Sequence, residues 1–495
     1  MIFSSSFWLC SLAIGVLATV YLRYRRLSSV PGPFLAAVTD LWRFSLTRSG
    51  QFSDTLIDLH TRYGAFVRIG PNAVSISDPA AVPTVHSMHG EFRKTDSYST
   101  LRALFNGKVI GSVVDLQDEN EVSALKRAVG SAFATKNLLD YEPDVDHTLD
   151  RLAQAMRKRR TFSLLDAMQQ FQVDFLMKAA FSRDTDYLET NRSTDAISGD
   201  VRLKHWYIWQ SMPGLEWLLF KSPLSPAWYR KPAKPPAWTA MASEEYRKRV
   251  KSHSDKPVGT AREKADLLSK YLTGREQHKE TVSQTNIVRM ISSTIAAGFD
   301  TSAYTITMIL YNLLKHPAAL KKLRSELDDA LNSGRLSSPP RLNEVDKLDY
   351  LGAVFKETMR LQPFLKPLLE REVPLGGADI AGRFLPGGTT VAISVRSVHR
   401  DIAVFGKDAD EFRPERWLEA DQQHRPRMER SMLAFGGGKR VCMGRHIAEL
   451  EMKKAVPRLL MEFDISLEDP SYVYKARDKL TNFPTPFAIV CTDRA

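Results

Sequence analysis

Apolar and polar positions follow different patterns in different parts of the chain. Residues 2 to 22 contain no charged side chain, and as a helix this run is about long enough to cross the hydrocarbon of a bilayer. The stretch "AFVRIGPNAVSISD", residues 65 to 78, alternates apolar and polar positions around a Gly-Pro-Asn turn and predicts a β-hairpin. From about 117 to 330 the apolar positions recur mainly with helical spacing. These patterns predict a mainly α fold with a small β portion, an α+β class.

The second half of the chain predicts a series of helices interrupted by short strands. Helices are expected at 283 to 314, at 318 to 333 and over "LGAVFKETMRLQP", strands near 379 to 395, and a final helix from about 443. Ser283 can cap the first of these helices, and Pro317 must end it. Pro457 lies inside the final helix and is expected to kink it.

The stretch from 206 to 238 contains five of the eight tryptophans and the run "KPAKPP". This composition is typical of a poorly regular, apolar surface segment. Ordinary core is the alternative, while tryptophan beside lysine and proline also suits a membrane interface or the lid of a lipophilic pocket.

The front of the chain predicts a membrane anchor followed by one large domain. Residues 1–22 are interpreted as an N-terminal transmembrane helix, and residues 23–36 as a basic, proline-rich linker. A cleaved signal peptide is the alternative, but the cations at Arg23, Arg25 and Arg26 follow the apolar run instead of preceding it. By the positive-inside rule, the remainder faces the cytosol. Residues 37–495 contain no internal repeat or long low-complexity stretch, so they are expected to form a single domain.

Charge and cysteine content narrow the class of protein. The formal net charge of +12 favours acidic partners, but zinc-finger spacing and a heptad-linked basic region are both missing, so no nucleic-acid partner is expected. Three cysteines cannot build a disulfide framework, which predicts a reducing compartment for the folded part.

One cysteine lies in the glycine-rich stretch "FGGGKRVCMG", residues 435 to 444. The glycines allow close approach to a flat object, and Lys439, Arg440 and the N-terminus of the following helix are expected to lower the pKa of the Cys442 thiol. A catalytic nucleophile would need a nearby base, and only His446 is adjacent. Zinc or iron–sulfur sites would need more cysteines. A single axial thiolate to haem iron remains.

The same ten residues resemble the cysteine-ligand loop of the cytochromes P-450, FxxGxRxCxG, at every defined position. The resemblance continues over the chain from "PGP" onward, and it is greatest to the fungal, microsomal, pisatin-demethylase-like members. It implies one haem domain with heme b (iron protoporphyrin IX) ligated by Cys442. Phe435 and Gly438 would contact this cofactor.

A second match is "AGFDTS", residues 297 to 302, within the long predicted helix. Ala297 and Thr301 are four residues apart, so they share a helix face and leave a small notch lined by a hydroxyl. The segment resembles the oxygen-binding segment of the family, in which Ala297 would lie against the haem, Thr301 would stabilise dioxygen and Asp300 would relay protons. The alternative is a Thr301 hydroxyl bonded to its own helix and an Asp300 in a surface salt bridge.

Two further motifs concern structure. "ETMR" places Glu357 and Arg360 as an i,i+3 pair, which by itself contributes a few tenths of a kcal/mol when exposed. With "FRPERW", residues 412 to 417, it resembles the family's ExxR and PERF elements. The resemblance implies a buried triad of Glu357, Arg360 and Arg416 that holds the cysteine loop.

The resemblance also implies contacts to the two haem propionates. Arg371 and Arg440 occupy the family's propionate-binding positions, and guanidinium groups pair well with carboxylates. Lys126 or Arg127 would add a further contact. The Trp or His that the family usually has one turn earlier is replaced by Val122 or Ser123.

The implied activity is monooxygenation of a lipophilic, uncharged small molecule by a single-pass protein of the endoplasmic reticulum. Electrons would come from NADPH through an acidic flavoprotein reductase. This partner would dock on cations around the cysteine loop: Lys439, Arg440, Arg445, Lys453 and Lys454.

The predicted pocket side chains are Phe105, Ile295, Phe299, Phe364, Leu365 and Phe483. A terpenoid, alkaloid or polyketide of secondary metabolism would fit. A peroxide-rearranging haem-thiolate isomerase and a non-catalytic haem protein are the alternatives.

Overall fold

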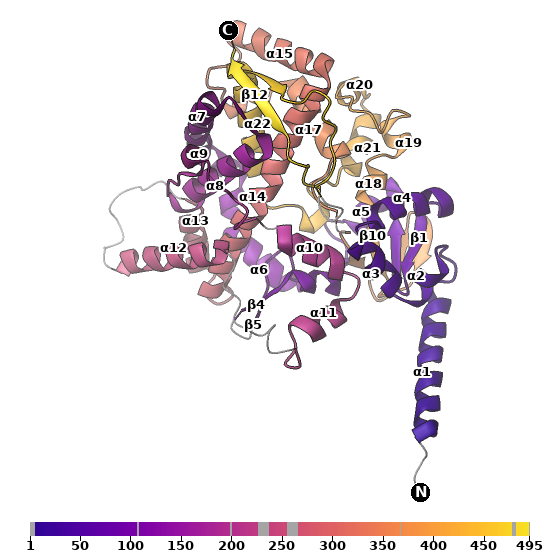
Figure 1. The fold of residues 1–495 in the computed structure, drawn as a ribbon. Helices are drawn as coiled ribbons and strands as arrows, with labels where there is room; N and C mark the ends of the chain where they lie inside the picture. Colours follow the sequence, from indigo (N-terminus) through magenta and orange to yellow (C-terminus); the bar gives the residue numbers. More distant parts are fainter. Residues whose placement is uncertain are drawn as a thin grey trace.

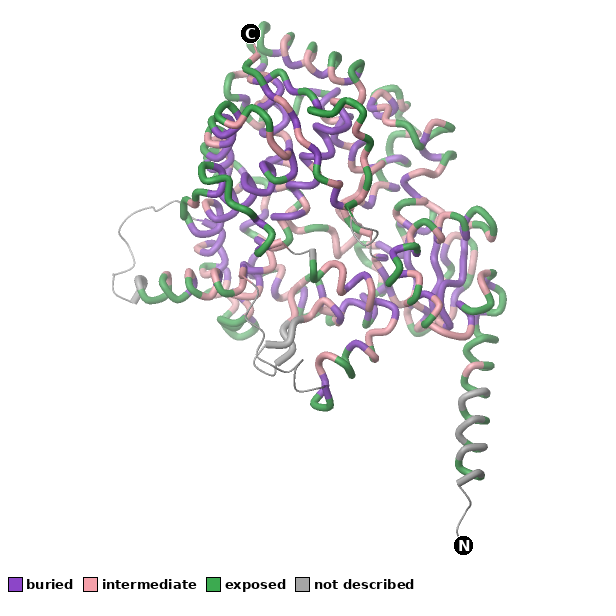
Figure 2. Tube along the Cα trace, viewed as in Figure 1, coloured by how far each residue is buried: buried purple, intermediate pink, exposed green. Residues whose placement is uncertain are grey.

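The computed structural model describes residues 5–105, 108–198, 200–225, 237–254, 266–366, 368–477 and 482–494. Most helices gather around the long helix α14, while a smaller part with the main sheet lies to one side and carries α1 (Figure 1). Figure 2 shows that the buried chain is concentrated in these two parts. The predicted mainly α fold with a small β portion is confirmed.

The helices alternate with short strands along the chain. The helices are α1 (Ser5–Arg26), α2 (Phe34–Val38), α3 (Leu41–Arg48), α4 (Phe52–Tyr63), α5 (Val82–Val85), α6 (Glu119–Val129), α7 (Glu142–Arg159), α8 (Leu164–Phe181), α9 (Tyr187–Thr190), α10 (Asp200–Trp209), α11 (Pro213–Phe220), α12 (Ala237–Ser254), α13 (Leu267–Gln277), α14 (Gln284–Lys315), α15 (Pro317–Asn332), α16 (Leu342–Val345), α17 (Asp349–Leu361), α18 (Val395–Val398), α19 (Ile402–Phe405), α20 (Arg416–Glu419), α21 (His424–Ser431) and α22 (Arg445–Glu462). The strands are β1 (Phe66–Gly70), β2 (Ala73–Ile76), β3 (Arg93–Lys94), β4 (Ala103–Phe105), β5 (Lys108–Ile110), β6 (Thr161–Ser163), β7 (Arg371–Glu372), β8 (Ala378–Ile380), β9 (Arg383–Leu385), β10 (Thr390–Ile393), β11 (Phe463–Leu467) and β12 (Ala488–Asp493).

The main sheet joins the front of the chain to its second half. Its strand order is β1-β2-β10-β7-β3, with β1 and β2 forming the predicted antiparallel hairpin. Strand β10 runs parallel to β2, and β7 pairs antiparallel with both β10 and β3. In the last pair, Lys94 lies opposite Arg371. Sheet formation therefore brings together two cations that are far apart in the sequence.

The long helix α14 begins and ends where the sequence predicts. Ser283 forms a capping box with Asn286, and the helix ends at Lys315, before Pro317. The other predicted helices are also present as α15, α17 and α22. Helix α22 continues through the buried Pro457 to Glu462.

The tryptophan-rich region is more regular than predicted, because α10 and α11 occupy much of it. Trp206 and Trp238 are buried, and Trp217 is half exposed. The expectation of an irregular segment was therefore wrong for these helices, since buried aromatic contacts order them. Residues 226–236 of this stretch lie outside the described residues.

Helix α1 projects from the sheet-bearing part (Figure 1). The buried Arg68 donates hydrogen bonds of 2.9 Å to the carbonyl oxygens of Arg23 and Tyr24 at the end of α1. Leu27 and Val30 are buried in the core beneath the sheet. Among the described residues, no helix combines the length and the apolar character needed to span a bilayer, so the transmembrane assignment finds no support here. The domain limits at residues 22 and 36 stay predictions.

Candidate active site

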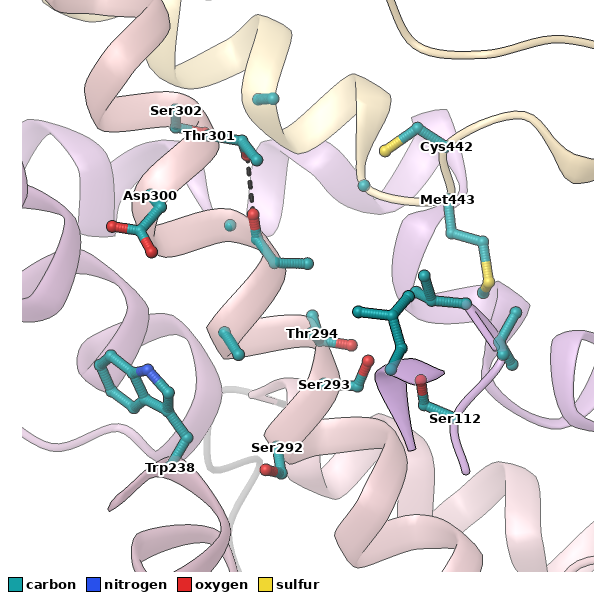
Figure 3. A pocket seen from close by; sticks show the side chains of 18 of the residues that line it. Ser112, Trp238, Ser292, Ser293, Thr294, Asp300, Thr301, Ser302, Cys442 and Met443 are labelled. Carbon is teal, nitrogen blue, oxygen red and sulfur yellow. Dashed lines mark hydrogen bonds between the residues drawn. The ribbon is translucent and has the colours of Figure 1, made fainter. Parts of the chain in front are cut away.

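A cavity of about 1060 Å³ lies beside α14 and the Cys442 loop. Cys442 and Met443 lie on one side of α14, whereas Asp300 and Trp238 lie on its other side (Figure 3). Side chains from the loop, from α14 and from strands β3 and β7 line the cavity. The fold thus brings the predicted sulfur ligand and the predicted oxygen-binding helix to one cavity.

The Cys442 loop is closed by its own backbone and by residues near its glycines. The Cys442 N–H donates to the Phe435 carbonyl at 2.9 Å. Gly438 has φ +61°, and a Cβ there would lie 2.3 Å from the His86 carbonyl oxygen. Gly438 is therefore required for close packing on the backbone of residues 86–87, and it does not line the cavity. Phe435 does line the cavity, and the Arg445 guanidinium lies over its ring at 5.6 Å.

The predicted pKa of the Cys442 thiol was wrong in direction. Burial raises this pKa, and the effect outweighs the lowering by the backbone N–H groups of Gly444 and Arg445. Lys439 and Arg440, which were expected to lower the pKa, are not among its main influences. The protein alone therefore favours the neutral thiol. A bound metal ion would supply the charge that deprotonates it.

The notch in α14 forms as expected, with both of its residues lining the cavity. The Thr301 hydroxyl donates to the Ala297 carbonyl oxygen at 2.7 Å, which is the back-bonded arrangement considered as an alternative. Helix α8 packs closely against Gly298, since a Cβ added there would lie 3.3 Å from the Leu176 side chain.

Asp300 is 2% exposed, so the alternative of a surface salt bridge was wrong. Its carboxylate accepts hydrogen bonds from the Ser198 hydroxyl at 3.2 Å and from the Gln169 amide at 3.3 Å. Both donors are neutral. Sequence reasoning missed them because they come from α8 and from the segment before α10, which no local motif connects to α14.

Arg371 lines the cavity together with Tyr98 and with Lys94, which sequence reasoning missed. The Arg371 guanidinium donates to the Tyr98 hydroxyl at 3.1 Å, and the Lys94 ammonium lies 4.3 Å from the centre of the Tyr98 ring. Burial lowers the pKa of Lys94, and the neighbouring Arg371 charge lowers it further. Like charges directly opposite each other on paired strands are unfavourable unless an anion compensates them.

Of the remaining predicted propionate contacts, Arg440 and Lys126 line the cavity and Arg127 does not. Arg440 lines the cavity and donates to the Glu119 carboxylate at 2.8 and 3.0 Å. Lys126 also lines the cavity and donates to the Lys439 carbonyl at 2.6 Å. Arg127 is exposed on α6 and does not line the cavity, because it points away from the packed face of the helix. Of the Lys126 and Arg127 pair, only Lys126 is placed to contact a cofactor.

These residues fit a dianionic cofactor such as haem. In the part of the chain that the structure describes, Lys94, Lys126 and Arg371 contact only neutral groups and form no ion pair. Buried cations without anionic partners are costly, and two propionates would compensate them. Cys442 would supply the sulfur ligand of the iron.

The predicted triad forms a fully buried network. Glu357 accepts two hydrogen bonds from Arg360, at 2.8 and 2.9 Å, and one from Arg416 at 2.9 Å. The Trp417 indole N–H and the Arg413 backbone N–H donate to the same carboxylate. Sequence reasoning missed the role of Trp417, although this residue follows Arg416 directly in the motif "PERW". Arg416 is also paired with Asp408 at 2.9 Å, so two carboxylates compensate the two arginines of this network.

The predicted pocket side chains separate by helix face. Phe364 and Leu365 line the cavity, but Ile295, Phe299 and Phe483 do not. Phe299 packs against Trp238 at 5.6 Å between ring centres, on the side of α14 away from Cys442. The assignments of Ile295 and Phe299 were wrong because α14 is buried on more than one side, so apolar character did not identify its cavity face. Phe483 packs against Phe364, at 5.5 Å between ring centres. The Phe105 side chain lies outside the described residues.

The predicted basic docking face is smaller than expected. Lys454 is 1% exposed and is bound to Glu142 and Asp146, so it does not belong to a surface. Lys453 and Arg445 are paired with acidic neighbours on the outside.

Comparison with known proteins agrees with this geometry. The Cytochrome P450 family model matches residues 31–489. A cytochrome P450 monooxygenase of Aspergillus terreus is 37% identical over 451 residues, covering 90% of this chain and 91% of that protein. Cytochrome P450 monooxygenase cicH of Emericella nidulans is 33% identical and is covered over 96% of both chains. The cysteine loop beside the cavity, the notched helix and the Glu357 network therefore belong to a member of the cytochrome P450 family, a monooxygenase.

Proposed function

We propose that this monooxygenase oxidises a lipophilic small molecule of fungal secondary metabolism, with electrons from NADPH delivered by a flavoprotein reductase. One observation carries the proposal: Cys442 and the Ala297–Thr301 notch of α14 line the same cavity (Figure 3). When bound, a haem with a thiolate ligand supplies the activation of dioxygen. The protein's own residues would position the substrate, exclude water and move protons.

The proton-handling residues are Thr301 and Asp300. Since the Thr301 hydrogen is given to the Ala297 carbonyl, the lone pairs of its oxygen remain able to accept a hydrogen bond in the cavity. Asp300 holds its carboxylate between the neutral donors Ser198 and Gln169. Because a hydroxyl and an amide lie within hydrogen-bond distance of it, this buried carboxylate can take up a proton and release it again.

The substrate class follows from the lining. Leu101, Val113, Ala296, Leu365 and Val395 present apolar surface to the cavity. This favours a terpenoid, alkaloid or polyketide over a highly charged substrate. Similarity to fungal monooxygenases, including mpaDE of Penicillium brevicompactum at 33% identity, supports a role in secondary metabolism.

The redox partner would approach the side of the molecule that carries the cysteine loop. Arg127 on α6 and Arg445 at the start of α22 are exposed there, so an acidic reductase would be steered toward them. We further propose that residues 1–22 attach the protein to the endoplasmic reticulum with the catalytic domain in the cytosol. The charge-free run and the cations at 23, 25 and 26 support this proposal.

The peroxide-rearranging alternative would need neither reductase nor proton relay. The buried Asp300 and the adjacent Thr301 favour the monooxygenase, because such a pair is unnecessary for rearrangement.

The test is the double variant Asp300→Asn with Thr301→Val, assayed with reductase and NADPH. We expect product formation to fall roughly 100-fold while peroxide release per NADPH rises. Thr307→Val is the matched control, since Thr307 also donates to its own helix, at 2.7 Å to Ala303, but lies away from the cavity. Unchanged product yield in the double variant would refute the relay, and turnover without reductase would favour the isomerase.

A further inference from the structure

His399 is a fully buried residue that neither the sequence motifs nor the cavity assigns to a role. It follows α18, is 0% exposed and does not line the cavity. Its backbone carbonyl accepts a hydrogen bond from the Arg360 guanidinium at 2.8 Å. His399 is therefore directly attached to the Glu357 network.

The imidazole joins two segments that are distant in the sequence. Its Nδ1 donates to the Arg360 carbonyl oxygen at 3.0 Å, because a carbonyl can only accept. Its Nε2 accepts from the Leu433 backbone N–H at 2.8 Å. One neutral tautomer satisfies both bonds.

From Leu433 the connection continues to the sulfur ligand. The Leu433 carbonyl accepts from the Gly436 N–H at 2.8 Å, and the Phe435 carbonyl accepts from the Cys442 N–H at 2.9 Å. Leu433, Phe435 and Cys442 all line the cavity. A continuous hydrogen-bonded path thus runs from Arg360 through His399 to the loop.

We propose that His399 is a positioning residue that fixes the Cys442 loop to the Glu357–Arg360 pair and so keeps the sulfur in place to ligate iron. The triad alone does not touch the loop through any described side-chain bond of Glu357, Arg360 or Arg416. The imidazole supplies the connection.

The environment keeps this imidazole neutral. Burial lowers the pKa of His399 to about 3, and the charges of Arg360 and Arg400 oppose a second proton. Nε2 therefore stays an acceptor for the Leu433 N–H throughout the working range of the enzyme.

Two amide variants separate the two bonds of the ring. The Asn amide is attached at Cγ, as Nδ1 is, so in His399→Asn it can donate to the Arg360 carbonyl but falls short of Leu433. The Gln amide extends one carbon further, to the position of Nε2, so in His399→Gln it can accept from Leu433. Trp417→Phe is the matched control, since it removes one bond to Glu357 and leaves the loop untouched.

The experiment loads each full-length variant with haem and records the reduced carbon monoxide spectrum, which distinguishes thiolate from other ligation. We expect the ratio of thiolate-ligated to other forms to fall about tenfold in His399→Asn, the effect of one unsatisfied buried N–H. His399→Gln and Trp417→Phe should keep the wild-type ratio even where their thermal stability falls.

A wild-type ratio in folded His399→Asn would overturn the proposal, as would an equal loss in all three variants, which would indicate general destabilisation. If His399→Asn does not fold, hydrogen exchange in the wild type decides. Slow exchange of the Leu433 amide, comparable with the Cys442 amide, supports the bond to His399. Exchange at the rate of a surface loop refutes it. Neither result depends on the substrate or the reductase.

Discussion

Two clusters of charged side chains, one around Glu357 and one at the cavity, are built in opposite ways. In the cluster around Glu357, two arginines, an indole and a backbone N–H surround one carboxylate. In the cavity cluster, by contrast, Lys94, Lys126 and Arg371 contact only neutral groups among the described residues. The first cluster is complete within the protein, and the second is complete only with an anionic cofactor. Whether the charges are compensated within the protein thus distinguishes the structural network from the binding site.

The largest expected effect comes from removing the ligand that the cavity cluster serves. In Cys442→Ser we expect product formation to fall to background, because a hydroxyl replaces the sulfur. The free energy of unfolding of the cofactor-free protein should change by less than about 1 kcal/mol, since the thiol makes no structural ion pair. Turnover and urea unfolding measure the two quantities. A large loss of stability would make Cys442 a structural residue as well.

Glu357→Gln tests the complete cluster. Removing this carboxylate leaves the buried Arg360 without a carboxylate partner and Arg416 with Asp408 alone, so the free energy of unfolding should fall by roughly 3–5 kcal/mol. Glu429→Gln is the control, because its pair with Lys356 is exposed and contributes about 0.5 kcal/mol or less. Equal effects in the two variants would mean that the network carries no special stability.

Glu451 is an intermediate case, a buried carboxylate that lines the cavity and accepts from the Gln172 amide at 3.2 Å. Burial raises its pKa from 4.5 to about 7. Between these two values the folded protein holds a proton that the unfolded chain releases. The free energy of unfolding that this proton contributes is fully present below pH 4.5 and is lost as the pH rises through about 7. Relative to Glu451→Gln, the wild type should lose roughly 2 kcal/mol between pH 5 and 8. Parallel stability curves for the two proteins would contradict this.

The smallest expected effect is that of Lys94→Met, and its effect on the free energy of unfolding has the opposite sign to that of Glu357→Gln. Lys94→Met removes a buried, uncompensated cation, so it should stabilise the cofactor-free protein by about 1 kcal/mol. The same change should make the loaded protein lose haem roughly tenfold faster, since a charged hydrogen bond contributes about 1.5 kcal/mol. Denaturant unfolding and haem transfer to an acceptor protein measure the two effects. Destabilisation of the cofactor-free protein would show that Lys94 is structural.

Local motifs predicted the parts of this site that lie within a few residues of each other. The Cys442 loop, the Ala297–Thr301 notch and the Glu357–Arg360 pair are of this kind. Lys94 could not be predicted, because its place opposite Arg371 depends on the register of β3 and β7. The raised pKa of Cys442 could not be predicted either, since the desolvation that causes it is not visible in the local sequence.

Periodicity showed which helices exist but not which of their faces meets the cavity. Helix α14 has buried residues on several of its faces. Apolar character therefore did not separate Phe299 and Ile295 from Ala296 and Ala297, which line the cavity. The predicted spanning helix depended on the length of the charge-free run and on the cations after it, but no helix of the described residues combines the length and apolar character to span a bilayer. The bonds from Arg68 to the end of α1 could not be predicted, since they join segments more than 40 residues apart.

Strand β3 is the edge of the five-stranded sheet and is joined to it by two residue pairs, one of them Lys94 with Arg371. Short edge strands are among the first parts of a sheet to open. A cofactor whose carboxylates contact both cations would act as a cross-link between β3 and β7. Newly synthesised chains that have not yet captured haem would thus expose an open sheet edge, which proteases and chaperones can recognise, so cofactor supply would set the lifetime of the protein.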